Sequence, residues 1–148
     1  FAAVAAAVGP ERAALFFVLR EAARLRDREG LRGPALDEAV ATLLVRAAPL
    51  GLPLTEIAHL EAVAARHLPA LTDWRAAPAA WFDPGADDAR TGGVFMAEAN
   101  RASSHARDRH MARALAVAAL AGERVFAAVG RNHVPKQAPA LRCALLSP

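Results

Sequence analysis

The chain of 148 residues contains no tyrosine, one cysteine and one lysine. The single cysteine, Cys143, excludes an internal disulfide and a zinc site built from several cysteines. Its apolar neighbours in the stretch ALRCALL predict a buried small side chain and not a nucleophile. Because Lys136 is the only lysine, arginine carries nearly all of the positive charge.

The sequence also lacks a run of apolar residues long enough to span a bilayer. The opening stretch FAAVAAAVG has no basic region of the kind that begins a signal peptide. The chain begins with Phe1 and not with methionine, which indicates a processed chain, a trimmed chain or a fragment. The compartment therefore stays open, with the cell envelope and the cytoplasm both compatible.

The charge pattern does not indicate a nucleic-acid partner. The net charge is +3, and basic residues alternate with acidic ones, as in REAARLRDREG over residues 20–30. Alternating signs are typical of a solvated helix face, and the chain has no basic block or binding motif. Hydrophobic residues make up 55% of the chain and charged residues 22%, which predicts a folded domain with a core.

Apolar residues at helical spacing predict a largely helical chain. Proline begins two of these segments and acidic residues follow it, which suits the first turn of a helix. Gly122 stands where a glycine cap would end the last and longest segment. The predicted helices span residues 10–30, 34–47 and 56–68, and a long one begins between Val94 and Ser104 and ends at Ala121.

One segment predicts a β-strand. The continuous apolar run RVFAAV, residues 124–129, is typical of a strand that is covered on both faces. After it, Pro135 and Pro139 predict a loop, and residues 140–146 predict a short helix. Helix, strand, loop and helix in this order are typical of a layered α/β sheet, in which ligands bind at the carboxyl ends of the strands. Since one strand cannot form a sheet, we expect partner strands upstream, with this chain as the C-terminal part of a larger domain.

The expected fold is therefore an α-rich α/β domain or part-domain over residues 1–148. A helical region over 1–70 precedes a connector over 71–93, and residues 94–148 carry the helix, strand, loop and helix. The connector contains Trp74 and Trp81 among turn-forming clusters, which predicts a loop with short helical turns. Such a loop either covers a site or simply packs through its indole rings.

The stretch from Arg107 to Pro135 resembles the C-terminal signature of a superfamily of proteins. This superfamily includes the TraB/GumN and Tiki-type proteins, the erythromycin-esterase proteins and the ChaN-like haem-uptake proteins. Its pattern is RD..MA early in a helix, then a glycine, a hydrophobic strand and G-x-x-H. The matching residues are Arg107, Asp108, Met111, Ala112, Gly122, Gly130 and His133. The match covers about a fifth of the chain, and the second G-x-x-H motif of the family does not occur in this sequence. The helical first half fits the helical insertion of such proteins.

The candidate chemistry centres on His133, just beyond the predicted strand. An imidazole there can bind a divalent metal ion or act as a general base, because it titrates near neutrality. Arg107 would stabilise developing negative charge through its planar guanidinium group, and Asp108 would orient His133 or the arginine. Gly130, by turning at positive φ, and Asn132 would contact the substrate. The simpler alternatives are a surface histidine in a turn and an aspartate favoured by the helix dipole.

The other histidines and the serines of the helices carry no recognisable site. His105 and His110 are five residues apart and do not share a helix face. His59 and His67 are two turns apart on an alanine-rich helix, too far to share one ion. Ser103 and Ser104 could be nucleophiles, but no G-x-S-x-G motif surrounds them. These side chains are expected on helix surfaces or at caps.

The resemblance implies a hydrolase that cleaves a peptide or ester-type bond in a peptide or small molecule, with a metal ion assisting in one version. The alternative is a ChaN-like protein of haem or iron uptake. That branch binds haem through tyrosine, so here a histidine or an upstream residue would have to replace it. The third possibility is a helical interaction domain without a catalytic site. The oligomeric state is not predicted.

Overall fold

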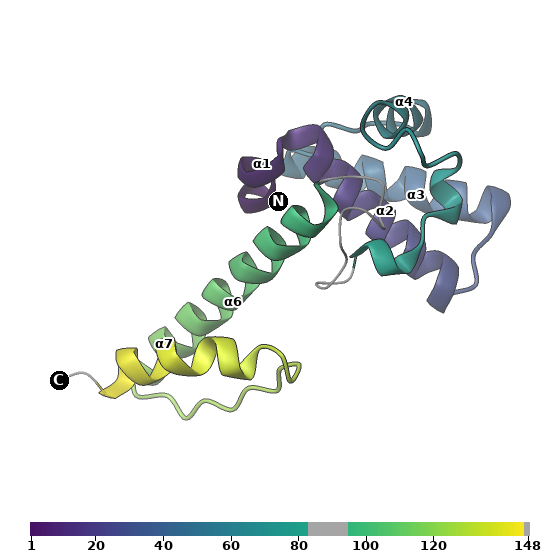
Figure 1. The fold of residues 1–148 in the computed structure, drawn as a ribbon. Helices are drawn as coiled ribbons and strands as arrows, with labels where there is room; N and C mark the ends of the chain where they lie inside the picture. The colour runs from purple at the N-terminus through teal and green to yellow at the C-terminus, as the bar shows by residue number, and fades with distance from the viewer. Residues whose placement is uncertain (83–94, 147–148) are drawn as a thin grey trace. The chain divides into compact units, whose positions relative to one another are not determined.

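In a computed structural model, the described residues 1–82 and 95–146 form six α-helices and three short 3-10 helices, without a strand (Figure 1). The expectation of an α/β fold is therefore wrong for the described part of the chain, which is all-α. The α-helices are α1 (Ala2–Val8), α2 (Pro10–Arg28), α3 (Gly33–Ala47), α4 (Ile57–His67), α6 (Met96–Leu120) and α7 (Val134–Leu146). The 3-10 helices are η1 (Ala48–Leu50), η2 (Trp74–Ala76) and η3 (Ala79–Phe82).

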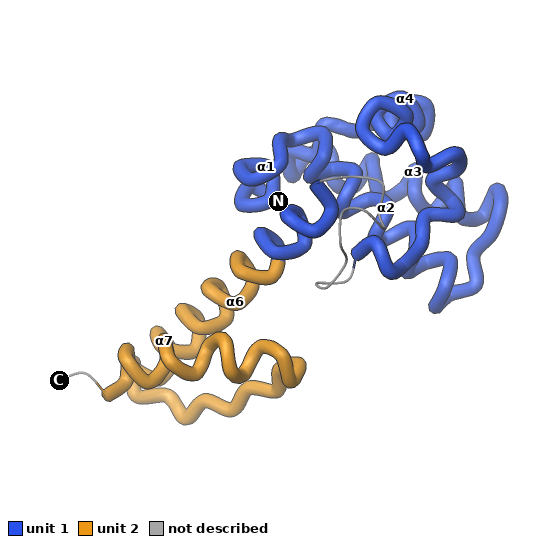
Figure 2. The backbone as a smooth tube through the Cα atoms, in the orientation of Figure 1, with its two compact units in different colours: residues 1–103 blue, residues 104–148 orange. Residues whose placement is uncertain are grey.

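The chain divides into two compact units, unit 1 (Phe1–Ser103) and unit 2 (Ser104–Pro148), and the division falls inside α6 (Figure 2). Unit 1 holds the large apolar core, whose fully buried side chains come mostly from α2, α3 and α4. Unit 2 consists of the second part of α6, an irregular connection and α7. No helix in the described ranges is long and apolar enough to cross a membrane.

Helix α2 is the centre of unit 1. It contacts α1, α3, α4, η2 and η3. Its middle, from Ala13 to Leu19, is buried almost throughout, as expected for a helix covered on several sides. Pro10 begins it and Glu11 lies in its first turn, so the start predicted from sequence is confirmed.

Two arginines hold the described part of the Trp-containing connector against the helices of unit 1. Arg26 of α2 donates from Nη1 to the backbone oxygens of Arg75 and Ala77 at 2.8 and 2.9 Å. Arg75 Nε donates to Asp37 Oδ1 at 2.6 Å and Nη2 donates to Oδ2 at 2.8 Å. The same guanidinium lies 4.4 Å from the ring centre of Trp74, which is buried. Short helical turns are present as predicted at η2 and η3, while residues 83–93 of the expected connector lie outside the described residues.

We expect Asp37→Asn to weaken unit 1 in a pH-dependent way. Hydrogen bonds from Arg75 hold the pKa of Asp37 below its ordinary value of 3.8, against the opposing effect of burial. The stabilisation is thus complete above pH 3.8 and is lost as the pH falls through the lowered pKa. Because each side chain is about one-third exposed, the loss at pH 7 should be small, about 0.5–1 kcal/mol.

Urea unfolding followed by tryptophan fluorescence at pH 7 and near pH 2 measures this difference. Glu38→Gln, an exposed change one residue further along α3, is the control and should match the wild type at both pH values. A penalty for Asp37→Asn that persists undiminished at the lower pH would contradict the assignment.

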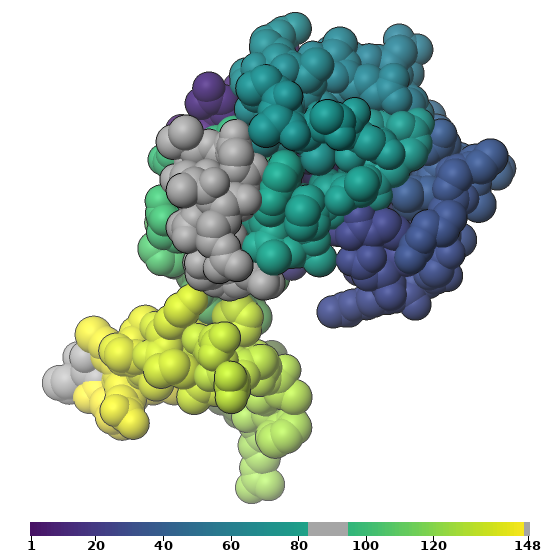
Figure 3. Space-filling model, turned by 45° about the vertical axis from the view of Figure 1, so that its right-hand side comes forward, coloured from purple at the N-terminus to yellow at the C-terminus, as the bar shows by residue number. Residues whose placement is uncertain are grey.

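The predicted strand over residues 124–129 is not formed. These residues have no regular secondary structure, and Phe126 is 94% exposed. In the space-filling view, the yellow-green segment after α6 projects from the rest of unit 2 (Figure 3). A strand requires backbone hydrogen bonds to a neighbouring strand, and the described residues contain none. The apolar run therefore stays exposed.

Two further expectations for unit 2 are wrong. The loop expected at Pro135–Pro139 belongs to α7, where Pro135 lies in the first turn, at which proline needs no backbone hydrogen bond. Pro139 lies inside the helix, and the buried Gln137 packs this part of α7 against α6. Cys143, predicted to be buried, is exposed. The predicted cap at Gly122 is confirmed, with φ 84° and a hydrogen bond from its N–H to Ala119 O.

Candidate functional site

Unit 2 brings Asp108 and His133 into direct contact. Asp108 lies on α6 and His133 directly precedes α7. His133 Nδ1 lies 2.5 Å from Asp108 Oδ1. Gln137, in the first turns of α7, donates from Nε2 to the same carboxylate oxygen at 3.1 Å. The packing of the start of α7 on α6 thus joins two residues that are 25 positions apart in the sequence.

A tight turn positions His133. Its N–H donates to Gly130 O at 2.9 Å, and its own carbonyl accepts the N–H of Gln137 at 3.0 Å, as in the first turn of a helix. Gly130 does not have a positive φ, so the conformational reason expected for this glycine is wrong. A Cβ added to Gly130 would lie 3.5 Å from His133 Cδ2, which is ordinary contact. Gly130 and Asn132 are both exposed and lie three residues and one residue before His133, and their expected contact with a substrate stays a prediction.

Asp108 is a buried carboxylate near the middle of α6, far from the first turn that begins at Met96. The helix dipole therefore does not explain it. Burial raises the pKa of Asp108, but hydrogen bonds from Gln137 and His133 and attraction to His133 and Lys136 outweigh it, so that the pKa lies below 3.8. The group is thus ionised at neutral pH.

The ionised carboxylate decides the state of the imidazole. A carboxylate can only accept a hydrogen bond, so the proton of this contact belongs to His133 Nδ1. In the neutral ring Nε2 is then unprotonated and can accept a proton. No hydrogen bond joins Nε2 to another described residue, and the His133 side chain is 22% exposed. The arrangement leaves a ring nitrogen without a hydrogen-bond partner among the described residues, on a side chain that is partly open to solvent.

Lys136 completes the cluster, and the sequence analysis did not identify it. Its Nζ donates to Ser104 Oγ at 3.2 Å and lies 3.8 Å from Asp108 Oδ2. That oxygen is buried and has no hydrogen-bond partner among the described residues. Lys136 and Gln137 follow His133 by three and four positions, the spacing of one helical turn. This helical spacing could have indicated that the two side chains lie near His133, but residues 135–139 were predicted to form a loop.

Arg107 is not part of the cluster. It is exposed, and it forms no hydrogen bond or ion pair with Asp108 or His133. Consecutive residues on a helix point about 100° apart, so a buried Asp108 directs the Arg107 side chain to another face of α6. The cation beside the carboxylate is Lys136 instead.

A divalent metal ion does not fit the contacts of His133. A carboxylate behind an imidazole is common at metal sites, but such sites use three or more protein ligands. The described residues contain no group of three histidine, cysteine or carboxylate side chains that could hold an ion. Moreover, the ammonium group of Lys136 lies 3.8 Å from Asp108 Oδ2, the carboxylate oxygen that has no hydrogen-bond partner among the described residues.

Haem fits no better. It needs only one axial ligand, which Nε2 of His133 would supply, but it also needs apolar walls around the porphyrin. The two other side chains that contact Asp108, Lys136 and Gln137, are polar, and no apolar pocket around Nε2 is found among the described residues. The contacts of His133 therefore favour acid–base chemistry.

Comparison of the chain with models of protein families, with curated proteins and with solved structures finds no match. The geometry of this cluster and the short resemblance over residues 107–135 are therefore the two features of the chain that bear on its function.

Proposed function

We propose that the chain is a hydrolase in which His133 is the general base and Asp108 orients it. One observation carries the proposal: the 2.5 Å contact between His133 Nδ1 and the buried carboxylate of Asp108, which leaves Nε2 open. An imidazole held in this tautomer by an ionised carboxylate is the arrangement that activates water or a hydroxyl group in hydrolases.

In the proposed step, Nε2 of His133 removes a proton from a water molecule while the water oxygen attacks the carbonyl carbon of the substrate. Asp108 stabilises the imidazolium ion that forms. The tetrahedral intermediate then breaks the bond to the leaving group, which takes the proton from Nε2. An ester yields an acid and an alcohol, and a peptide yields an acid and an amine.

Lys136 can supply the positive charge that such a step needs. Its ammonium group has three N–H bonds, of which one points to Ser104 and one lies near Asp108, which leaves the third for a developing oxyanion. The Lys136 side chain is 46% exposed and lies at the surface. Ser104 is an unsuitable nucleophile, because it is buried and its hydroxyl faces a cation that cannot take its proton.

The resemblance to the TraB/GumN, Tiki-type and erythromycin-esterase proteins supports the same class of substrate, a peptide or ester-type bond. The residues that carry it include Asp108 and His133. The metal-assisted version of this chemistry is set aside because the described residues near His133 supply too few ligands.

Hydrolysis should persist when metal ions are removed. We expect the chain to cleave activated acetyl esters or short peptides at the same rate before and after dialysis against a chelator, because base and charge both come from side chains. The release of acid from a series of such substrates is the measurement. A complete lack of hydrolysis across the series would contradict the proposed function, and a rate that vanishes with the chelator and returns with zinc would contradict its metal-free form.

A further inference from the structure

Among the described residues, unit 2 holds seven of the ten exposed large apolar side chains, although unit 1 is more than twice as long. The most exposed is Phe126, at 94%. It lies in the irregular segment over residues 124–129, called here the arm. The exposed large apolar residues of unit 2 are Val117, Leu120, Val125, Phe126, Val134, Leu145 and Leu146.

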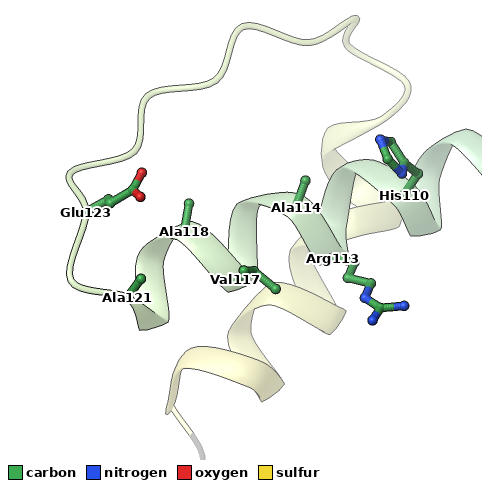
Figure 4. A pocket seen from close by; sticks show the side chains of 7 residues that line it. All are labelled: His110, Arg113, Ala114, Val117, Ala118, Ala121 and Glu123. Carbon is green, nitrogen blue, oxygen red and sulfur yellow. The ribbon is translucent and has the colours of Figure 1, made fainter.

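The same unit also contains an open groove with a small-residue floor. The groove has a volume of about 570 Å³ and lies along α6, where the chain that leaves Glu123 arches away from the helix (Figure 4). Its floor is formed by Ala114, Val117, Ala118 and Ala121, which recur at helical spacing along one side of α6. Arg113, His110 and Glu123 provide charge or polarity at its edges.

We propose that a second copy of this chain fills the groove, with the arm of each copy lying in the groove of the other. Phe126 would enter the space over the alanines. Its own groove does not take it, since the ring is almost fully exposed. Unit 2 thus carries both a protruding aromatic residue and an apolar groove, and a mutual exchange of the two between copies is a two-fold contact.

Size and charge both suit this occupant. The groove, at about 570 Å³, exceeds the volume of one aromatic ring, so it has room for the Phe126 side chain. Arg124 precedes them in the arm, and Glu123 stands at the edge of the groove, so in a two-fold contact each arginine approaches the glutamate of the partner. Edges with charges of both signs favour such a protein surface over a membrane.

The proposed contact leaves the His133 cluster open. Val117 follows Asp108 by nine positions on α6, which is about 180° around the helix axis. The groove and the buried carboxylate therefore lie on opposite sides of α6, and neither the arm nor the groove contains a residue of the cluster.

Sedimentation equilibrium tests the dimer. We expect the chain to reach twice its mass of 15.5 kDa at micromolar concentration. Phe126→Asp should weaken the association at least about tenfold. In the proposed dimer it replaces a large apolar side chain that the contact buries with a charge that the contact would have to bury. Leu50→Asp, a change at a comparably exposed leucine of unit 1, is the matched control and should leave the dimer intact.

A mixing experiment tests the reciprocal exchange. Ala114→Arg places a long side chain in the groove while it keeps the helix propensity of α6 high. Each variant alone, Ala114→Arg or Phe126→Asp, should be a monomer whose circular dichroism spectrum matches that of the wild type. When the two variants are mixed, with an affinity tag on one of them, they should form a heterodimer that the tag retains. Ala114→Arg keeps an intact arm and Phe126→Asp keeps an intact groove, so one of the two contacts can form. A monomeric wild type, a dimeric Phe126→Asp, or a mixture that stays monomeric would overturn the proposal, as would binding of the wild type to neutral phospholipid vesicles in place of self-association.

Discussion

Replacing His133 with alanine is expected to lower kcat/KM for ester or peptide hydrolysis by about 10²–10⁴-fold, the usual contribution of a general base. The loss should appear in kcat and not in KM, because in the proposed step Nε2 removes a proton during bond formation and does not bind the substrate. The helix content should stay unchanged, since His133 is only partly buried at the start of α7. Steady-state kinetics on the best substrate of the ester and peptide series measures the effect.

Two controls separate a base from a structural role. His105→Ala changes an exposed histidine of α6 outside the cluster and should leave the kinetics unchanged. Added imidazole should restore part of the activity of His133→Ala, because a free base can reach a site that is open to solvent. Wild-type kcat/KM in His133→Ala would remove His133 from the mechanism and with it the proposed function.

The largest expected effect on stability comes from Phe16. Phe16→Ala should lower the free energy of unfolding by about 3–5 kcal/mol, since the ring is fully buried on α2 and its removal leaves a cavity. Its ring centre lies 5.2 Å from that of Phe17 and 6.2 Å from that of Phe82 in edge-to-face geometry, so two aromatic contacts are lost as well.

Denaturant unfolding followed by tryptophan fluorescence measures this loss, because Trp74 lies in the core of unit 1. Val45→Ala on α3, where the side chain is 68% exposed, is the control and should change the stability by no more than about 0.5 kcal/mol. A loss below about 1 kcal/mol for Phe16→Ala would mean that α2 does not organise the core as its burial indicates.

The local sequence pattern identified part of the candidate site. Asp108 and His133 were selected from the sequence, and the structure places them in contact. Arg107 was selected by the same pattern but points to solvent, and Lys136 was missed. A linear motif identifies residues that are close in sequence to a site. Which of them belong to the cluster depends on which face of α6 packs against α7.

A second example lies in unit 1, where His67 was expected to be an ordinary surface residue. Its Nε2 lies 2.8 Å from Glu11 Oε2, and its Nδ1 accepts a hydrogen bond from Arg12 at 3.3 Å. Glu11 and His67 are 56 positions apart. No local signal could have joined them, because the contact depends on the packing of α4 against α2.

The sequence by itself determined the helices α2, α3, α4 and α6, since proline and acidic residues at helix starts, apolar periodicity and the glycine cap at Gly122 act through neighbours in the chain. Only the tertiary structure decided the state of residues 124–129, because an apolar run becomes a strand only where another strand accepts its hydrogen bonds. The same holds for the cluster at Asp108: its chemistry depends on contacts between helices, whose partners are distant in sequence.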